Sequence, residues 1–441
     1  MNYLLIYSHQ LSNRLRYITR IVFSQVLNCE YKLIDNIDEF KSYQGPKLNY
    51  SYKQLEQEAF ISANEFIFQT GIKDQDINVF RYQETSVFFS TSKNSILPFD
   101  VFSASFFMLS RYEEYLPCIR DDYDRFEAKS SLAYQNNFLQ IPVVNYWCLQ
   151  LKQVLLVRFP DLVFKESKFT YLSTIDIDNA YAYKEKGFLR TLGAYAKSLL
   201  AFDIPVIIER TKVLIGLQKD PYDTYGYQDE LHKKYRIKSH YFFLVGDYGV
   251  NDTNVPITSR LLKRLIKSIS DNSNIGIHPS YASSVKQEKF SLEIDRLEHV
   301  LNKHITSSRQ HFLRLRLPDT YRRLLELDIS DDYTMGFASE LGFRAGICTP
   351  FYFYDLDNES ETRLMLHPFA FMEATLKYYL KLKPEESIEK LKPIIQEVKN
   401  VNGTLISLWH NESLSDWGVW KGWKGVYEEM IIEVKGNNFS T

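Results

Sequence analysis

The chain has 441 residues, of which 53 are basic and 55 acidic, giving a formal net charge of -2. This balance excludes a strongly basic chain, and nothing in it suggests an electrostatic footprint for nucleic acid or a membrane surface. Hydrophobic residues make up 45% of the chain, with 31 Tyr and 30 Phe, which excludes long disorder. A length of this order predicts two domains.

The first residues of the chain and its cysteines indicate the cellular compartment in which the protein is expected. Residues 1–9 hold a short apolar run without a basic segment, which predicts a strand and not a signal peptide. No apolar stretch is long enough to span a bilayer. The four scattered cysteines lack a Cys-x-x-Cys spacing and indicate free thiols in a reducing compartment. We therefore expect a cytoplasmic protein.

Residues 1–165 have the pattern of a small α/β domain of unknown role. The expected strands are Tyr3–Tyr7, Tyr31–Ile34 and part of Ala59–Phe68, and the expected helices are Leu15–Leu27, Phe99–Tyr115 and Val143–Arg158. The breaker Phe159-Pro160-Asp161 then marks the domain boundary.

Two charged segments lie at the end of the second of these helices and shortly after it. Arg111–Tyr115 and Asp121–Phe126 either form the rim of a cleft or make exposed ion pairs at a helix end. We favour exposed ion pairs, because such pairs are common on protein surfaces.

Residues 166–441 alternate strands with helices, which predicts a parallel sheet with helices outside it, either open or closed into a barrel. The expected strands are Phe169–Asp176, Ile237–Val245, Ile275–His278, His311–Leu315, Phe343–Ile347 and Leu405–His410. The expected helices are Leu189–Ala201, Val206–Leu217, Ile257–Ser270, Phe290–Leu301, Thr320–Glu326, Phe371–Leu382 and Ser387–Val398. In this architecture, functional groups lie at the C-terminal ends of the strands.

Acids and histidines recur at those predicted ends. Asp176 and Asp178 are two residues apart, so on a continuing strand they share a face and repel each other unless a cation or proton lies between them. The alternative is that both acids cap a helix or solvate a loop. His278, Arg309-Gln-His311 and His410 recur around later strands, which favours a metal-assisted active site.

The ordered motifs resemble those of the polysaccharide deacetylases with a NodB-type domain, the carbohydrate esterase family 4-like enzymes. They are Thr174-Ile-Asp-Ile-Asp178, Gly276-Ile-His-Pro-Ser280, Arg309-Gln-His311, Gly342-Phe-Arg344 and Leu408-Trp-His410. The resemblance covers roughly residues 166–435 and implies that the domain 166–441 is a distorted (β/α) barrel. The part before it resembles an uncharacterised domain that precedes such deacetylases in some bacteria.

The resemblance also implies roles for individual residues. Asp176 would be the general base, oriented by Arg309, and His410 would be the general acid. Asp178 and His278 would bind a divalent metal, and Asp331 or Asp332 would help to fix the site. Carboxylate and imidazole ligands favour Zn²⁺, which activates water and polarises an acyl oxygen.

One position departs from the family pattern. The second metal histidine, expected four residues after His278, is replaced by Ala282. A catalytic Zn²⁺ normally has three protein ligands, and His311 is the best candidate for the third. A water in its place, a different metal or a degenerate site are the alternatives.

Substrate contacts are predicted for Arg344, Trp409 and Asp332. Trp409 and the tryptophans after it either stack on a sugar or fill the core. The main hypothesis is a metal-dependent deacetylase of an N-acetylated amino sugar or related glycan, with no nucleic-acid partner. The rivals are a C–N hydrolase of a small non-sugar amide and a catalytically degenerate domain that binds glycan or acts as a scaffold.

Overall fold

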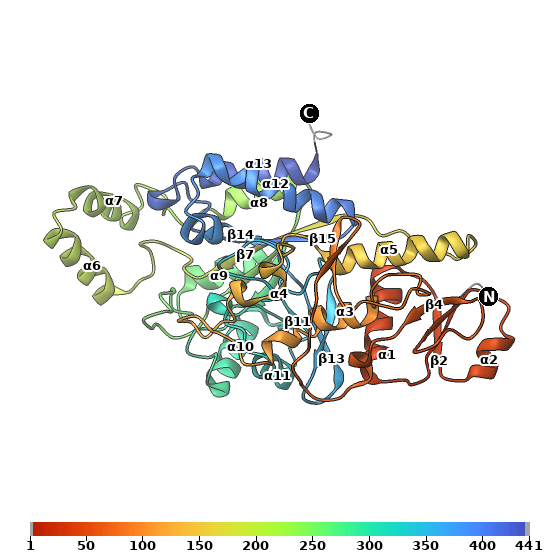
Figure 1. The fold of residues 1–441 in the computed structure, drawn as a ribbon. Coiled ribbons are helices and arrows are strands. Elements are labelled where there is room, and N and C mark those ends of the chain that lie inside the picture. The colour runs from red at the N-terminus through yellow and green to blue at the C-terminus, as the bar shows by residue number, and fades with distance from the viewer. Residues whose placement is uncertain (1–2, 437–441) are drawn as a thin grey trace.

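The computed structural model describes residues 3–436 and contains two larger sheets (Figure 1). The N-terminal sheet has four parallel strands in the order β2-β1-β3-β4. Its strands are β1 (Leu4–Tyr7), β2 (Tyr31–Ile34), β3 (Lys47–Ser51) and β4 (Ala59–Ser62), and a small hairpin joins β5 (Phe80–Tyr82) to β6 (Thr85–Val87). The helices of this half are α1 (Asn13–Arg20), α2 (Ile37–Ser42), α3 (Val101–Leu109), α4 (Leu132–Gln135) and α5 (Val143–Arg158).

The second sheet has nine strands in the order β12-β13-β11-β10-β9-β8-β7-β15-β14. All its neighbours are parallel except β12 and β13, which pair antiparallel. The strands are β7 (Thr170–Ile177), β8 (Lys238–Phe243), β9 (Asn274–Ile277), β10 (Ser307–Ser308), β11 (Asp331–Asp332), β12 (Phe351–Asp355), β13 (Ser360–Leu366), β14 (Phe371–Met372) and β15 (Thr404–His410).

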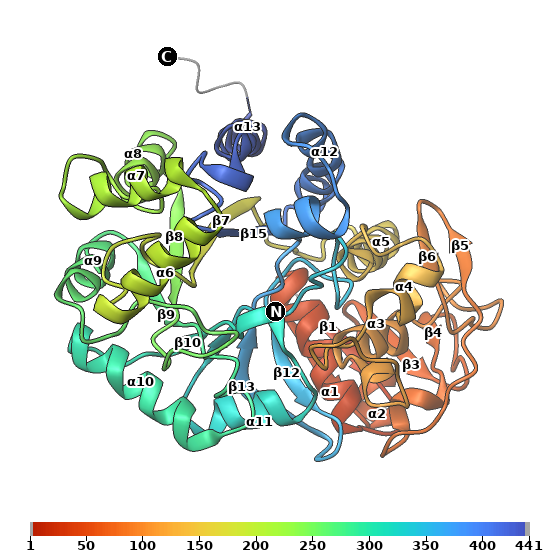
Figure 2. The same cartoon turned by 90° about the vertical axis from the view of Figure 1, so that its left-hand side faces the viewer.

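Helices lie outside this sheet (Figure 2). They are α6 (Phe188–Leu200), α7 (Ile204–Leu214), α8 (Tyr225–Lys234), α9 (Arg260–Ser270), α10 (Gln287–Leu301), α11 (Asp319–Glu326), α12 (Pro384–Asn400) and α13 (Trp423–Lys435). Within residues 3–436, no strand pairing joins β12 to β14, so the sheet is a curved but open arc. The α/β class with a parallel sheet is confirmed, whereas a closed barrel is not formed.

Helix α6 and strand β9 lie within a few residues of their predicted bounds, but three expected elements are wrong. The fourth strand is Ser307–Ser308, and His311–Leu313 forms a single 3₁₀ turn beyond it. Residues 343–347 are a buried loop with no strand, and 371–382 begins as strand β14 before one turn of π-helix at Thr375–Tyr379. In each case an apolar run is buried by contacts from elsewhere in the chain, and periodicity alone cannot identify that burial.

The two halves of the chain share one hydrophobic core. Tyr17 of α1 and Phe106 of α3 pack against Tyr354 of β12, with ring centroids 4.9 and 5.0 Å apart. The Tyr17 hydroxyl donates to the carbonyl of Tyr352 at 2.7 Å. Within the described part of the chain, no helix is both long and apolar enough to cross a bilayer.

Candidate active site

The site begins where β7 and β15 run side by side. The two strands pair in parallel register, with Asp176 opposite His410. Because side chains alternate along a strand, Thr174, Asp176 and His410 project from the same face of the sheet. The register therefore holds an acid and a histidine next to each other at the C-terminal edge.

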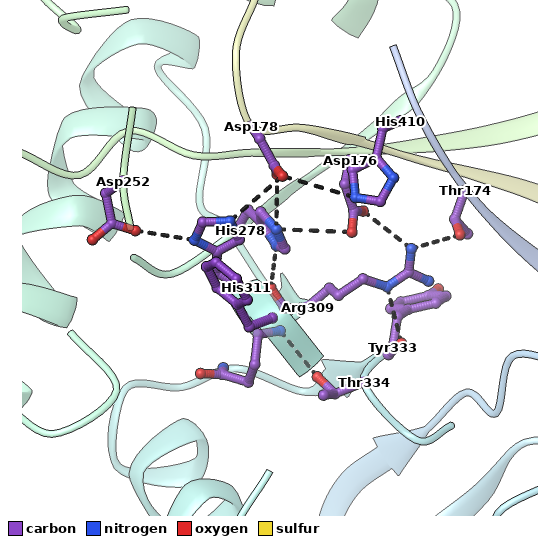
Figure 3. Close-up of polar contacts among 12 residues, drawn as sticks. Thr174, Asp176, Asp178, Asp252, His278, Arg309, His311, Tyr333, Thr334 and His410 are labelled. Carbon is purple, nitrogen blue, oxygen red and sulfur yellow. Dashed lines mark hydrogen bonds and ion pairs between the residues drawn. The ribbon is translucent and has the colours of Figure 1, made fainter. Parts of the chain in front are cut away.

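Arg309 fixes the Asp176 carboxylate from behind (Figure 3). Its Nη1 donates to Asp176 Oδ1 at 3.1 Å and to Thr174 Oγ1 at 2.7 Å, and its Nε donates to the carbonyl of Tyr333 at 3.0 Å. Arg309 is fully buried, and its guanidinium lies 4.8 Å from the centroid of the Phe242 ring. Since β10 ends at Ser308, Arg309 follows the strand, which corrects the expected strand at His311–Leu315.

Three side chains converge in front of Asp176. Nε2 of His278 lies 3.1 Å from Asp178 Oδ1, and Nε2 of His311 lies 3.4 Å from Asp178 Oδ2. One ligand atom from each of the three residues can be chosen so that all lie within 4.8 Å of one another. Asp178 directly follows β7, and His278 directly follows β9, so the C-terminal ends of two strands on either side of β8 bring them together.

The tautomer of His278 is set by its second nitrogen. Nδ1 lies 2.6 Å from the carbonyl oxygen of Arg309, and since a carbonyl only accepts, Nδ1 must donate. In neutral His278, Nε2 then presents its lone pair to the Asp178 carboxylate. Asp178 Oδ1 is buried and accepts no hydrogen bond among the described residues. Two electron-rich atoms facing each other in this way fit a cation between them.

His311 has a carboxylate behind it. Its Nδ1 lies 3.0 Å from Asp252 Oδ1, which also accepts from the backbone N–H of Tyr281 at 2.8 Å. Burial opposes the charged form of His311, but Asp178 and Asp252 outweigh burial and raise its pKa to about 9. A carboxylate behind a histidine is the usual arrangement around a metal-bound imidazole.

His410 is held on the other side of Asp178. Its Nδ1 lies 2.7 Å from Glu373 Oε1, which also accepts from the backbone N–H of His410 at 2.9 Å. Its Nε2 lies 3.8 Å from Asp178 Oδ2. Burial lowers the pKa of His410, but the fully buried Glu373 and then Asp178 and Asp176 raise it well above 6.5. His410 is therefore an imidazolium at neutral pH in this arrangement.

The donor set fits a divalent metal. One carboxylate and two imidazoles are a common ligand set of catalytic zinc. Burial opposes ionisation of Asp178, yet His311, His278 and His410 hold its pKa well below the usual range. The carboxylate is thus ionised, whereas a metal would have to displace the proton from His311.

These groups line a cavity of about 230 Å³. Its apolar wall includes Leu408, Met372 and Trp420. Arg125, from the N-terminal half, also lines it, donating to the carbonyl of Phe312 at 2.9 Å and to the Tyr379 hydroxyl at 3.0 Å. The interpretation of the segment 121–126 as exposed ion pairs is therefore wrong for Arg125, which is buried.

The predicted substrate residues lie apart from this cluster. Arg344 is buried in a salt bridge with Glu114 at 2.5 Å, beside a second cavity of about 240 Å³. Trp409 is fully buried against Tyr427, on the face of β15 opposite to His410. The carboxylate of Asp332 accepts from Thr334, and burial raises its pKa to about 6.

Sequence reasoning missed Asp252 and Glu373, the two carboxylates behind the histidines. Asp252 lies in a loop well beyond β8, and Glu373 follows the two-residue strand β14. Neither residue lies in a sequence motif. Each can be recognised only from the structure, by the histidine that it contacts.

Comparisons with known proteins give a family match for part of the chain. The model of DUF7033, a family of unknown function, matches residues 4–160. No curated protein matches the chain.

Solved structures resemble the chain only weakly. A Mycobacterium smegmatis protein assigned to the polysaccharide deacetylases is 15% identical, with a TM-score of 0.38, over 62% of this chain and 86% of that chain. A carbohydrate esterase family 4 pseudoenzyme from Bacillus anthracis is 12% identical, with a TM-score of 0.30, over 61% of each chain. A polysaccharide deacetylase from Bacillus cereus is 11% identical, with a TM-score of 0.28, over 60% of this chain and 89% of that chain. Because both enzymes and a pseudoenzyme are in this group, the similarity assigns no activity.

Proposed function

We propose that this protein is a metal-dependent hydrolase that removes acetyl groups from an N-acetylated amino sugar or a related glycan. The observation that carries the proposal is the convergence of Asp178, His278 Nε2 and His311 Nε2 between Asp176 and His410. The ordered motifs of the sequence support a sugar as the substrate, since they resemble those of the polysaccharide deacetylases.

Asp178, His278 and His311 would hold the divalent metal, most simply Zn²⁺. When bound, such an ion polarises the acyl oxygen and lowers the pKa of water at the site. In this proposal, His311 takes the place of the family's second metal histidine, whose position is occupied by Ala282 in this chain. Asp252 orients His311, as the Arg309 carbonyl orients His278.

Asp176 and His410 would divide the proton transfers. Asp176 is held by Arg309 and would take the proton of the attacking water. His410 is held protonated by Glu373 and would donate a proton to the departing amine, which leaves poorly as an anion. The two groups are neighbours across the β7–β15 pair, so both reach one bound acyl group.

Two rivals share the same residues. A C–N hydrolase of a small non-sugar amide would use the same groups and differ only in the walls of the cavity. A degenerate domain would need neither the Asp252–His311 contact nor the Glu373–His410 contact, and the presence of both favours an enzyme.

The test combines metal analysis with acetate release. Protein prepared without chelator should contain stoichiometric divalent metal, and it should release acetate from acetylated amino-sugar oligomers faster than from small amides. Asp176→Asn should abolish release while the metal content is retained. Asp247→Asn, which changes an exposed ion pair with Arg296, is the matched control. A protein without metal, or undiminished release by Asp176→Asn, would overturn the proposal.

A further inference from the structure

The α6–α7 hairpin extends away from the rest of the molecule (Figure 1). The segment that holds it begins just after the predicted metal ligand Asp178, and α6 itself starts at Phe188. Figure 2 faces the side towards which the hairpin extends in Figure 1, and α6 lies in front of the sheet in that view. The hairpin is therefore attached at the edge that carries the candidate active site.

The outer faces of both helices are apolar and exposed. Phe188 and Leu189 are each 80% exposed, Leu200 is 82% exposed, and Phe202 in the connecting turn is 86% exposed. The apolar positions of α6 recur at helical spacing and form one stripe. The exposed large apolar residues of the hairpin are Phe188, Leu189, Leu192, Leu199, Leu200, Phe202, Ile204, Ile208, Leu214, Ile215 and Leu217.

Polar side chains, by contrast, join the two helices to each other. The Tyr195 hydroxyl lies 2.8 Å from Thr211 Oγ1, and Arg210 Nη1 donates to Ser198 Oγ at 3.4 Å. A helix pair in water normally turns its apolar stripes inward. Soluble monomers rarely leave apolar patches of this extent uncovered, so a partner is needed for the outer face.

The charge of the segment that holds the hairpin indicates which kind of partner covers its apolar face. Residues 184–219 hold seven basic and three acidic residues, although the whole chain has a net charge of -2. A symmetric contact with a second copy would bring two positively charged hairpins together. An anionic lipid bilayer offers both an apolar interior for the exposed side chains and a negative surface charge for the basic ones. The balanced charge of the whole chain conceals this local excess.

The base of the hairpin contains a basic cavity of about 350 Å³. Lys186, Arg190 and Arg210 line it, and Lys186 donates to Asn179, the residue after Asp178. Arg190 lies over the Tyr248 ring, with 3.9 Å to its centroid. Burial, and then Arg190, lower the pKa of Lys186 to about 7, so the recess holds two guanidinium cations and a partly protonated lysine. Cations in a recess beneath an apolar surface match the depth order of a phospholipid, whose phosphate lies above its acyl chains.

We propose that the α6–α7 hairpin docks this protein on an anionic lipid bilayer. Helices of 13 and 11 residues are roughly 20 and 17 Å long, too short to cross a hydrocarbon core of about 30 Å. The hairpin lies in the plane of the interface, with Leu200 and Phe202 among the acyl chains. Docking brings the edge with Asp176 and His410 close to the membrane, where lipid-linked or membrane-proximal glycans are found.

The test is sedimentation of the full-length protein with vesicles. Vesicles of phosphatidylcholine with a minor fraction of phosphatidylglycerol should bind the protein, whereas pure phosphatidylcholine vesicles should bind it more weakly. Added salt should lower the binding to the anionic vesicles. Phe202→Ser and Leu200→Ser should each lower the partition coefficient roughly tenfold. Val157→Ser, an 86% exposed apolar position at the end of α5, should leave binding unchanged.

Two results would overturn the proposal. One is the absence of binding to anionic vesicles, or binding that the hairpin variants do not reduce. The other is a dimer in solution that Phe202→Ser dissociates, since a second copy would then cover the surface. Acetate release from a soluble substrate tests the proposed function separately, and the hairpin variants should retain it.

Discussion

At the scale of single residues, the three histidines of the site differ in what lies behind them. His278 donates to a backbone carbonyl, whereas His311 and His410 face the carboxylates of Asp252 and Glu373. A neutral acceptor fixes a tautomer without adding charge, while a carboxylate also strengthens the basicity of the ring. The partner alone does not assign the task, since His278 and His311 would both bind the metal, whereas His410, with a carboxylate behind it like His311, would be the acid.

Asp252→Asn should weaken metal binding. The substitution keeps a hydrogen bond to His311 but removes the negative charge behind it. Metal affinity is expected to fall by roughly 10–100-fold, the usual effect of losing such a partner. Competition with a chromophoric chelator measures it, with Asp247→Asn as the control. An unchanged affinity would show that His311 does not bind the metal.

Glu373→Gln should change the pH dependence of catalysis. A general acid must be protonated, and the pKa of His410 lies well above 6.5, so activity should persist above that pH and fall as pH rises through the raised pKa. Loss of the Glu373 charge lowers this pKa, and the alkaline limb of kcat should move down by roughly 1–3 pH units. A limb that stays in place would exclude His410 as the acid.

The predicted site residues were recognisable in the sequence to different degrees. Asp176, Asp178, His278 and His410 follow or end strands whose apolar runs are clear, and the sheet brings their side chains together. Their roles stay predictions. Asp252 could not be found, because only the folding of a loop brings it to His311.

At the scale of elements, the second sheet leaves little space between neighbouring segments where its strands are short. Strand β9 pairs with β10, and β10 pairs with β11, and each of these two partners has only two residues. The apolar run at Phe343–Ile347 predicted a further strand here, yet it is a loop buried against the N-terminal half. Its backbone N–H at Phe343 donates to the carbonyl of Leu139 at 2.8 Å, a contact that no local pattern predicts.

Gly276→Ala in β9 should destabilise the sheet. A Cβ there would lie 2.5 Å from the Phe242 ring and 2.8 Å from Ser307 Oγ. The free energy of unfolding should fall by about 1–3 kcal/mol, as measured in urea. Gly193→Ala in α6, where nothing lies within 4 Å, should instead raise it by about 0.5–1 kcal/mol. Equal effects of the two substitutions would contradict this account.

At the scale of the whole molecule, a buried ion cluster links the two halves. Arg344 donates to both oxygens of Glu114, and Glu114 also accepts from Arg111 at 2.7 Å. The expectation that Arg111 and Glu114 make exposed ion pairs is wrong, since both are about 1% exposed. The division into two domains stays a prediction, and the sequence does not reveal the charge cluster between the two halves.

Glu114→Ala should destabilise the protein by about 3–5 kcal/mol, because it leaves Arg344 buried without its partner. Glu361→Ala breaks a partly exposed pair between the same halves and should cost about 0.2–1 kcal/mol. Urea unfolding of both variants makes the comparison. Similar losses of unfolding free energy in the two variants would show that burial of the Glu114–Arg344 pair is unimportant.

The same cluster predicts acid sensitivity. Burial opposes ionisation of Glu114, but Arg344 and Arg111 lower its pKa from 4.5 to about 2. Its stabilising contribution is therefore complete above pH 4.5 and is lost as pH falls from 4.5 towards 2. Unfolding free energies of the wild type and of Glu114→Ala should converge over this range, and a constant difference would contradict the assignment.

The cluster also has a consequence for synthesis on the ribosome. Glu114 emerges 230 residues before Arg344, and Arg14 emerges 345 residues before its partner Glu359. At about 5–20 residues per second, the nascent N-terminal half waits on the order of tens of seconds for the strands that complete its core. During that interval its apolar surface is open to chaperones, and translation speed between these positions becomes a determinant of yield.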